Sequence, residues 1–105
     1  MPEANPSLAI RTHFADLTDP RIERTRLHNL LDIVVIAICA VICGAEGWVD
    51  IAQYGLAKHD WLKQFLELPH GIPSHDTFRR VFCLLDPAAF QVCFQHWIDA
   101  LKVWV

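Results

Sequence analysis

The sequence has few charged residues and no apolar run long enough to cross a membrane. Charged residues make up 20% of its 105 residues and hydrophobic residues 53%. This composition excludes a disordered chain and predicts one small domain with a substantial core. The richest apolar run, Ile33 to Cys43, is much shorter than the roughly 20 residues that a bilayer span needs. The opening MPEANPSLAI also lacks the basic and apolar regions of a secretory signal.

Positive charge is scarce as well. The formal net charge is −3, which argues against a protein that coats nucleic acid without sequence preference, because phosphate neutralisation needs a basic surface. The arginines are nevertheless grouped. Arg21, Arg24 and Arg26 cluster near His28. A second group, the pair Arg79 and Arg80, lies in the segment FRR at residues 78–80.

Closely paired cysteines are absent. The four cysteines, Cys39, Cys43, Cys83 and Cys93, stand in apolar helical contexts and form no C-x2-C pair of the kind that structural zinc sites use. We expect them to be buried small hydrophobic residues rather than metal ligands. Unpaired cysteines are typical of a reduced, cytoplasmic protein.

No alternating strand pattern and no internal repeat is present, so an all-α fold is predicted. Residues 1–26 are expected to form an N-terminal arm with a short helix, and residues 27–105 a helical domain. The apolar run within Leu30–Cys43 is too long for a typical strand and predicts a buried helix. We expect a bundle of four to six helices packed around it, with a helix-turn-helix-like segment. Gly55 either permits a close helix contact or marks a break.

The segment GIPSHDTFRRVFCLLD, residues 71–86, predicts a capped amphipathic helix. Ser74 is a good N-cap for a helix that begins at His75. An apolar stripe follows helical spacing, and a polar face lies opposite to it. The stripe consists of Phe78, Val81, Phe82 and Leu85, and the polar face of Asp76, Arg79, Arg80 and Cys83.

The last helix is expected to begin at Asp86-Pro87, with Asp86 as N-cap and Pro87 in the first helical position. Its predicted apolar side consists of Phe90, Cys93, Phe94, Trp97, Leu101 and Trp104. The four tryptophans could suggest a base-stacking surface. They fall on or beside apolar stripes, so core packing is favoured for Trp48, Trp61, Trp97 and Trp104.

From Phe14 to the end, the chain carries in order the elements DPR, LLDI, CGAEGW-DI and HGIPSHDTF-RVF-LLDP. In this combination it resembles the amino-terminal domain associated with DDE-type insertion-sequence transposases, specifically the H-repeat-associated group. The resemblance implies an accessory domain that precedes a ribonuclease-H-like catalytic domain, where acidic residues hold divalent metal ions. The sequence ends before such a domain, so no catalytic residue, metal ligand or cofactor is expected in this chain, and we do not expect it to be an enzyme.

Two candidate DNA contacts follow. In PSHDTFRR, Ser74, His75 and Thr77 could contact bases or phosphates, as at the start of a recognition helix, with Arg79 and Arg80 supplying charge. The alternative is that Ser74 only caps the helix, that the acidic residue complements the helix dipole and that the arginines are solvated.

The second candidate contact is DPRIERTRLH, in which Arg21, Arg24 and Arg26 could follow a DNA backbone as a flexible arm. Alternatively, Arg24 and Arg26 pair with Glu23, Asp19 or other surface acids. Since Asp19 precedes Pro20, a turn is expected at the start of this segment.

An enzymatic site is not favoured. His70, His75 and Asp76 lack the spacing of four residues that metal-binding histidines show on one helix face. The expected partners are therefore transposon-end DNA or, alternatively, the catalytic domain or other transposase chains, in an oligomerisation or interdomain module. The apolar ending LKVWV favours this alternative. No membrane partner is expected.

Overall fold

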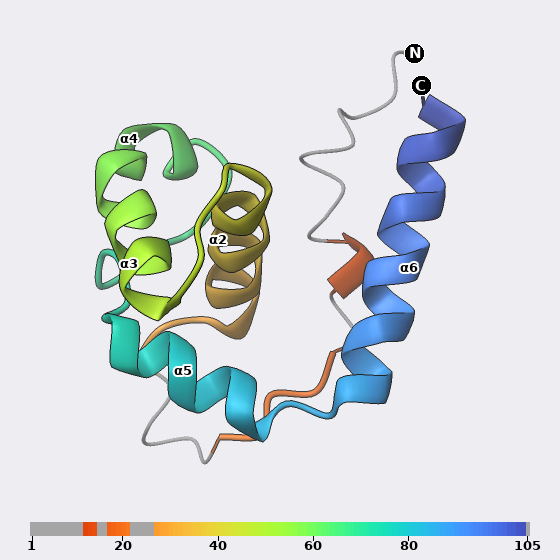
Figure 1. Ribbon diagram of the computed structural model, residues 1–105, viewed down its shortest axis with the longest axis horizontal. Coiled ribbons are helices and arrows are strands. Elements are labelled where there is room, and N and C mark those ends of the chain that lie inside the picture. The colour runs from red at the N-terminus through yellow and green to blue at the C-terminus, as the bar shows by residue number, and fades with distance from the viewer. Residues whose placement is uncertain (1–11, 15–16, 22–26, 105) are drawn as a thin grey trace. The chain divides into compact units, whose positions relative to one another are not determined.

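The structure is a computed structural model of the chain. It describes residues 12–14, 17–21 and 27–104, with no account of the side chains of residues 101–104. Within these ranges there is no strand, and the all-α prediction is confirmed. Residues 12–14 are helical, and five further helices follow: α2 (Leu30–Ile42), α3 (Trp48–Ala57), α4 (His59–Leu62), α5 (His75–Leu84) and α6 (Pro87–Trp104) (Figure 1).

The chain divides into two compact units, one made of residues 20–84 and the other of residues 1–19 and 85–105. The first unit holds α2 to α5. Its central helix is α2, in which the four consecutive residues 33–36 are fully buried. Since successive residues of a helix point about 100° apart, a run of four buried residues means that α2 is covered on every side. The predicted buried helix is therefore confirmed.

Helix α3 packs against both α2 and α5 (Figure 1). Gly55 makes the close approach possible, because a Cβ atom there would lie 2.7 Å from the Ile72 Cγ2 atom and 3.4 Å from the Ile36 Cγ2 atom. At the start of α3, the Trp48 ring stacks on the Phe82 ring of α5 at a centroid distance of 5.6 Å. Of the two interpretations of Gly55, the close contact is the one that the structure shows.

Helix α5 begins as predicted. The Thr77 backbone N–H donates to the Ser74 Oγ atom at 3.2 Å, so Ser74 caps the helix. Phe78 is 0% exposed and Val81 2% exposed, and both face the core. The opposite face is exposed, including Cys83. The predicted amphipathic helix is confirmed.

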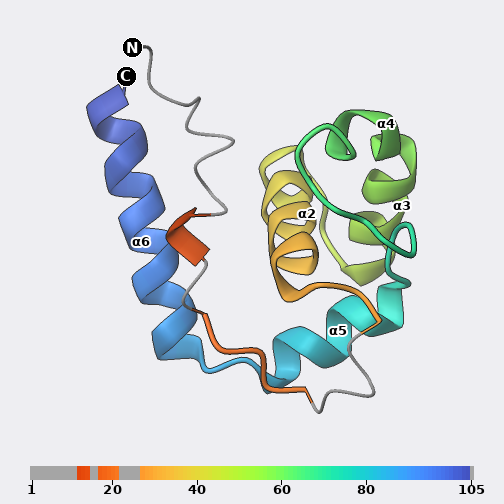
Figure 2. The same ribbon diagram turned by 180° about the vertical axis from the view of Figure 1, so that it is seen from behind.

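In the second unit, α6 starts at Pro87 with the Ala88 N–H donating to the Asp86 Oδ1 atom at 3.0 Å, which confirms the predicted cap. The Phe90 ring lies 5.5 Å from the ring of Phe14. This contact holds helical residues 12–14 beside α6 (Figure 2). Trp97 and Cys93 are also buried on this side of the helix.

Some side chains predicted to be buried are exposed. The prediction was wrong for Cys43 and Cys83, which are exposed, whereas Cys39 is half-buried and all four cysteines are free. The reason for Cys43 is that the last turn of α2 emerges from the core, where Ile42 is 67% exposed. Trp61 is 43% exposed, and its ring lies 5.0 Å from the Phe65 ring. No helix among the described residues has the length and apolar character that a membrane span requires.

Candidate nucleic-acid interface

The first turn of α5 carries three of the predicted DNA contacts. The Ser74 and Thr77 hydroxyl groups lie 3.1 Å apart and share a hydrogen bond, while His75 is exposed. Because the Ser74 oxygen also accepts the capping hydrogen bond, this hydroxyl has a structural role whether or not DNA is bound. Thr77 is half-buried and remains at the surface of the helix.

Arg79 and Arg80 share one carboxylate. The Arg79 Nη2 atom donates to the Asp76 Oδ1 atom at 2.7 Å, and the Arg80 Nε atom to the Asp76 Oδ2 atom at 3.0 Å. The hydrogen bond from Arg79 lowers the pKa of the Asp76 carboxyl group, and the same contact raises the pKa of Arg79. Two positive charges thus face one negative charge, so this face of α5 remains positive.

These ion pairs lie in water. The side chains of Arg79 and Arg80 are 50% and 65% exposed, and that of Asp76 is 45% exposed. Exposed pairs of this kind contribute little to stability and are readily exchanged for another anion. Both guanidinium groups are therefore in contact with solvent while they pair with Asp76.

Arg21 differs from the predicted flexible arm. It is only 8% exposed, and its Nη2 atom donates to the His28 carbonyl oxygen at 2.6 Å. Its guanidinium group is therefore held in place just before α2. Arg24, Arg26 and the alternative partner Glu23 lie outside the described residues.

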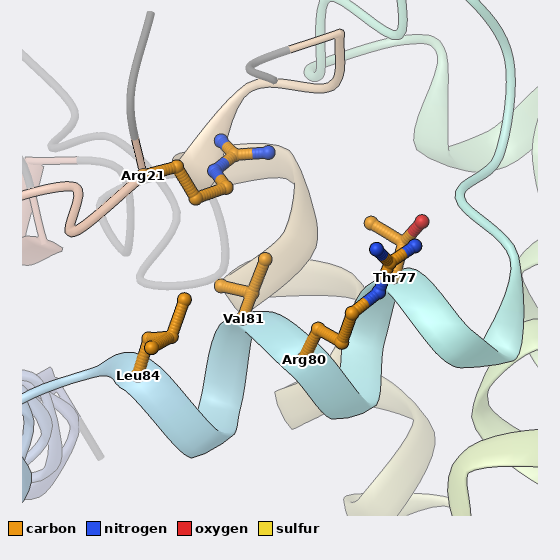
Figure 3. Close-up of a pocket in the computed structure, with 5 residues that line it drawn as sticks. All are labelled: Arg21, Thr77, Arg80, Val81 and Leu84. Atoms are coloured by element: carbon orange, nitrogen blue, oxygen red, sulfur yellow. The ribbon is translucent and has the colours of Figure 1, made fainter.

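Arg21 and α5 together line a cavity of about 440 Å³ (Figure 3). The residues that line it are Arg21, Thr77, Arg80, Val81 and Leu84. Two guanidinium groups and one hydroxyl group therefore share a cavity with two aliphatic side chains. Sequence reasoning did not find this cavity, because no local pattern indicates that Arg21 packs near α5.

A polar cluster lies at the start of α2. The buried Asp32 carboxylate accepts a hydrogen bond from the Leu68 backbone N–H at 2.8 Å, and the Asn29 side chain donates to Glu67. The rings of His28 and His70 meet edge to face at a centroid distance of 6.4 Å. Sequence reasoning missed this cluster, although an acidic residue inside an apolar helix is a signal for a buried hydrogen bond.

The pKa of His28 is lowered, first by burial and then by the charges of His70 and Arg21, against a weaker opposing effect of Asp32. His28 therefore binds a proton less readily in the folded protein than in the unfolded chain. The contribution of neutral His28 to the free energy of unfolding is therefore fully present above the ordinary histidine pKa, and it is lost as the pH falls below that value.

We expect the urea midpoint to fall between about pH 7 and about pH 5, and His28→Gln to flatten this dependence. Tryptophan fluorescence during urea titration measures it. His75→Gln removes an exposed imidazole and is the control that keeps the slope. An unchanged slope in His28→Gln would show that other groups cause the acid sensitivity.

Among the described residues, no group of three or more His, Cys, Asp or Glu side chains is placed to hold a metal ion.

The fold and the site define a small all-helical domain with arginines on an exposed helix face. Its sequence matches the DDE_Tnp_1-associated family over residues 11–98, and the chain belongs to this family. It is a transposase-associated domain of the kind found in the N-terminal region of H-repeat-associated putative transposases.

Three relatives illustrate the match. An uncharacterized protein in the dhlA 3' region of Xanthobacter autotrophicus is 51% identical over 91 residues, which cover 86% of this chain and 31% of that protein. The H repeat-associated putative transposase YhhI of Escherichia coli K12 is 49% identical over 71 residues, 68% of this chain and 19% of that protein.

The third relative, the inactive transposase YbfQ of the same strain, is 53% identical over 55 residues, 52% of this chain and 66% of that protein. The chain thus spans less than a third of the length of the first two relatives. No solved structure matches it.

Proposed function

We propose that this domain contributes to transposon-end DNA binding as an accessory part of a transposase. The observation that carries the proposal is the exposed face of α5, where Arg79 and Arg80 are only half neutralised by Asp76. A DNA phosphate can replace the carboxylate at either guanidinium group, because exposed ion pairs cost little to break and guanidinium–phosphate hydrogen bonds are bidentate.

The start of α5 adds further donors to this surface. His75 is exposed in the first turn, and the Thr77 hydroxyl stands one turn before Arg80. Backbone N–H groups at a helix N-terminus also favour anions. In this proposal the arginines bind phosphates and set the position of the domain, whereas His75 is the residue placed to reach a base edge. Arg24 and Arg26 remain candidates for backbone contacts from the sequence alone.

The proposal is tested by fluorescence anisotropy with a labelled duplex that carries the terminal repeat of the element. Arg79→Ala/Arg80→Ala is expected to weaken binding and to reduce the slope of log affinity against log salt by about 2, one for each lost phosphate contact. Asp76→Asn is expected to strengthen binding, because it leaves both guanidinium groups without their competing carboxylate.

The control is Lys58→Ala/Lys63→Ala, which removes the same charge from the residues that directly follow α3 and α4. Equal losses in the two double variants would show that only net charge matters and would contradict a site on α5. A scrambled duplex of the same length separates recognition of the terminal repeat from general binding.

An oligomerisation or interdomain module is the second candidate. The observation that favours it is an apolar surface at the turn between α2 and α3, where Val41, Ile42 and Val49 are 57%, 67% and 52% exposed. Analytical ultracentrifugation distinguishes the two functions. Dimers that form with rising concentration, together with no affinity for any duplex, would favour this module over DNA binding.

We place the domain in the cytoplasm, which agrees with its four free cysteines.

A further inference from the structure

The cavity beside α5 combines charge with an apolar wall. Arg21 approaches it from the segment before α2, whereas Thr77, Arg80, Val81 and Leu84 all project from α5 (Figure 3). No carboxylate is present among the described residues that line it. A site with two cations and aliphatic side chains suits a ligand that has an anionic end and a less polar body.

One of the two cations that line the cavity is held in place before any ligand binds. The Arg21 guanidinium group is buried and fixed by its 2.6 Å hydrogen bond to the His28 carbonyl oxygen. The Arg80 guanidinium group is 65% exposed and pairs through its Nε atom with Asp76, a contact that an incoming anion can replace. Groups that are already oriented lose less conformational entropy on binding, so they bind an anion more tightly than free side chains do.

The apolar side is formed by Val81 and Leu84. Val81 is 2% exposed and forms the floor, whereas Leu84 is 60% exposed and forms a lip that water reaches. In Figure 3 both side chains point from α5 toward the side on which Arg21 lies. The volume of about 440 Å³ falls within the range of roughly 300 to 1,000 Å³ that is typical of small-molecule sites. It is therefore large for a single phosphate group.

We infer that this cavity binds one unpaired nucleotide of a DNA strand. The phosphate lies against Arg21, Arg80 and the Thr77 hydroxyl group, and the sugar and base lie over Val81 and Leu84. The inference rests on the proposed function and specifies which part of the DNA binds in the cavity. A paired nucleotide inside a duplex cannot present its sugar and base in this way, so a frayed or overhanging strand end is the form of DNA that fits.

The test uses the full chain and two DNA probes, a blunt duplex and the same duplex with a single-nucleotide overhang. The unmodified protein is expected to prefer the overhang by about tenfold, the equivalent of one added charge-assisted hydrogen bond. Leu84→Glu places a carboxylate at the exposed lip and is expected to abolish this preference. Leu56→Glu, which places the same charge at a leucine of α3 that is 67% exposed and does not line the cavity, is the matched control and is expected to retain the preference.

Free thymidine monophosphate and inorganic phosphate are the small probes, followed through the amide NMR signals of Thr77, Val81 and Leu84. Thymidine monophosphate is expected to shift all three signals in the unmodified protein and not in Leu84→Glu. Equal shifts with inorganic phosphate would overturn the inference, because the sugar and base would then contribute nothing.

The failure of this inference can be told from failure of the proposed function. If both duplexes bind equally and Arg79→Ala/Arg80→Ala weakens both, the proposed function stands and the nucleotide site is overturned. If neither duplex binds while thymidine monophosphate still shifts the signals, DNA is not the ligand, and both the proposed function and the assignment to a DNA strand are overturned.

Discussion

Replacing Phe78 with alanine is expected to lower the free energy of unfolding by about 3 to 5 kcal/mol. Phe78 is 0% exposed and lies on the face of α5 that packs toward the core, where α5 contacts α3. Removing its ring leaves a cavity that the surrounding helices fill only in part, so the lost transfer energy and the cavity both contribute. Urea denaturation followed by circular dichroism measures the change.

Phe82→Ala is the matched comparison on the same helix. Phe82 is half-buried and stacks on Trp48, so its loss is expected to cost roughly half as much, in proportion to the smaller area that it buries. Equal effects for the two variants would contradict the burial pattern of α5. Since Phe78→Ala is expected to disturb the position of α5, it is also expected to weaken any DNA binding by this helix.

Replacing Asp32 with alanine is expected to cost about 2 to 3 kcal/mol, because it leaves the Leu68 N–H without its carboxylate partner. Asp32 is 2% exposed and accepts that hydrogen bond at 2.8 Å. Leu68 has a φ angle of +44°, in the left-handed region that residues with a Cβ atom rarely adopt. The carboxylate thus holds a strained backbone segment against the start of α2.

Asp32→Asn separates the hydrogen bond from the rest of the side chain. Its amide oxygen can still accept the bond from the Leu68 N–H, so we expect a smaller loss, about 1 kcal/mol or less. Thermal denaturation of the three proteins side by side measures the difference. If Asp32→Asn is as unstable as Asp32→Ala, the negative charge matters more than the hydrogen bond to Leu68.

Helix α5 contributes both to the stability of the domain and to its proposed DNA binding. Its buried face fixes the helix in the core through Phe78 and Val81, and its exposed face presents Arg79 and Arg80. The position of the arginines is therefore set by packing on the other side of the same helix. This is why variants on the exposed face can test DNA binding without unfolding the domain.

Local features of the fold could be predicted from the sequence because they depend on nearby residues. The caps at Ser74 and Asp86 each use a side chain and a backbone N–H within three residues of it. The buried face of α5 follows from helical spacing alone. Exposure of Cys43 and Trp61 could not be predicted, because an apolar pattern does not show where a helix leaves the core.

The candidate site was predicted only in part for the same reason. The arginine pair on α5 and its acidic neighbour lie within one helical turn, so spacing places them together. Arg21 is different, because its place at the cavity depends on how the segment before α2 packs near α5, more than 50 residues later in the chain. No local sequence pattern indicates that packing.

By itself, the sequence determined an all-helical transposase-associated domain, the starts of α5 and α6 and the arginine pair on α5, because periodicity, caps and ordered motifs are local properties. The tertiary structure alone decided the close contact at Gly55, the hydrogen bond between Asp32 and Leu68, and the cavity that Arg21 shares with α5. Each of these joins residues far apart in the chain, and such pairs meet only when the helices pack.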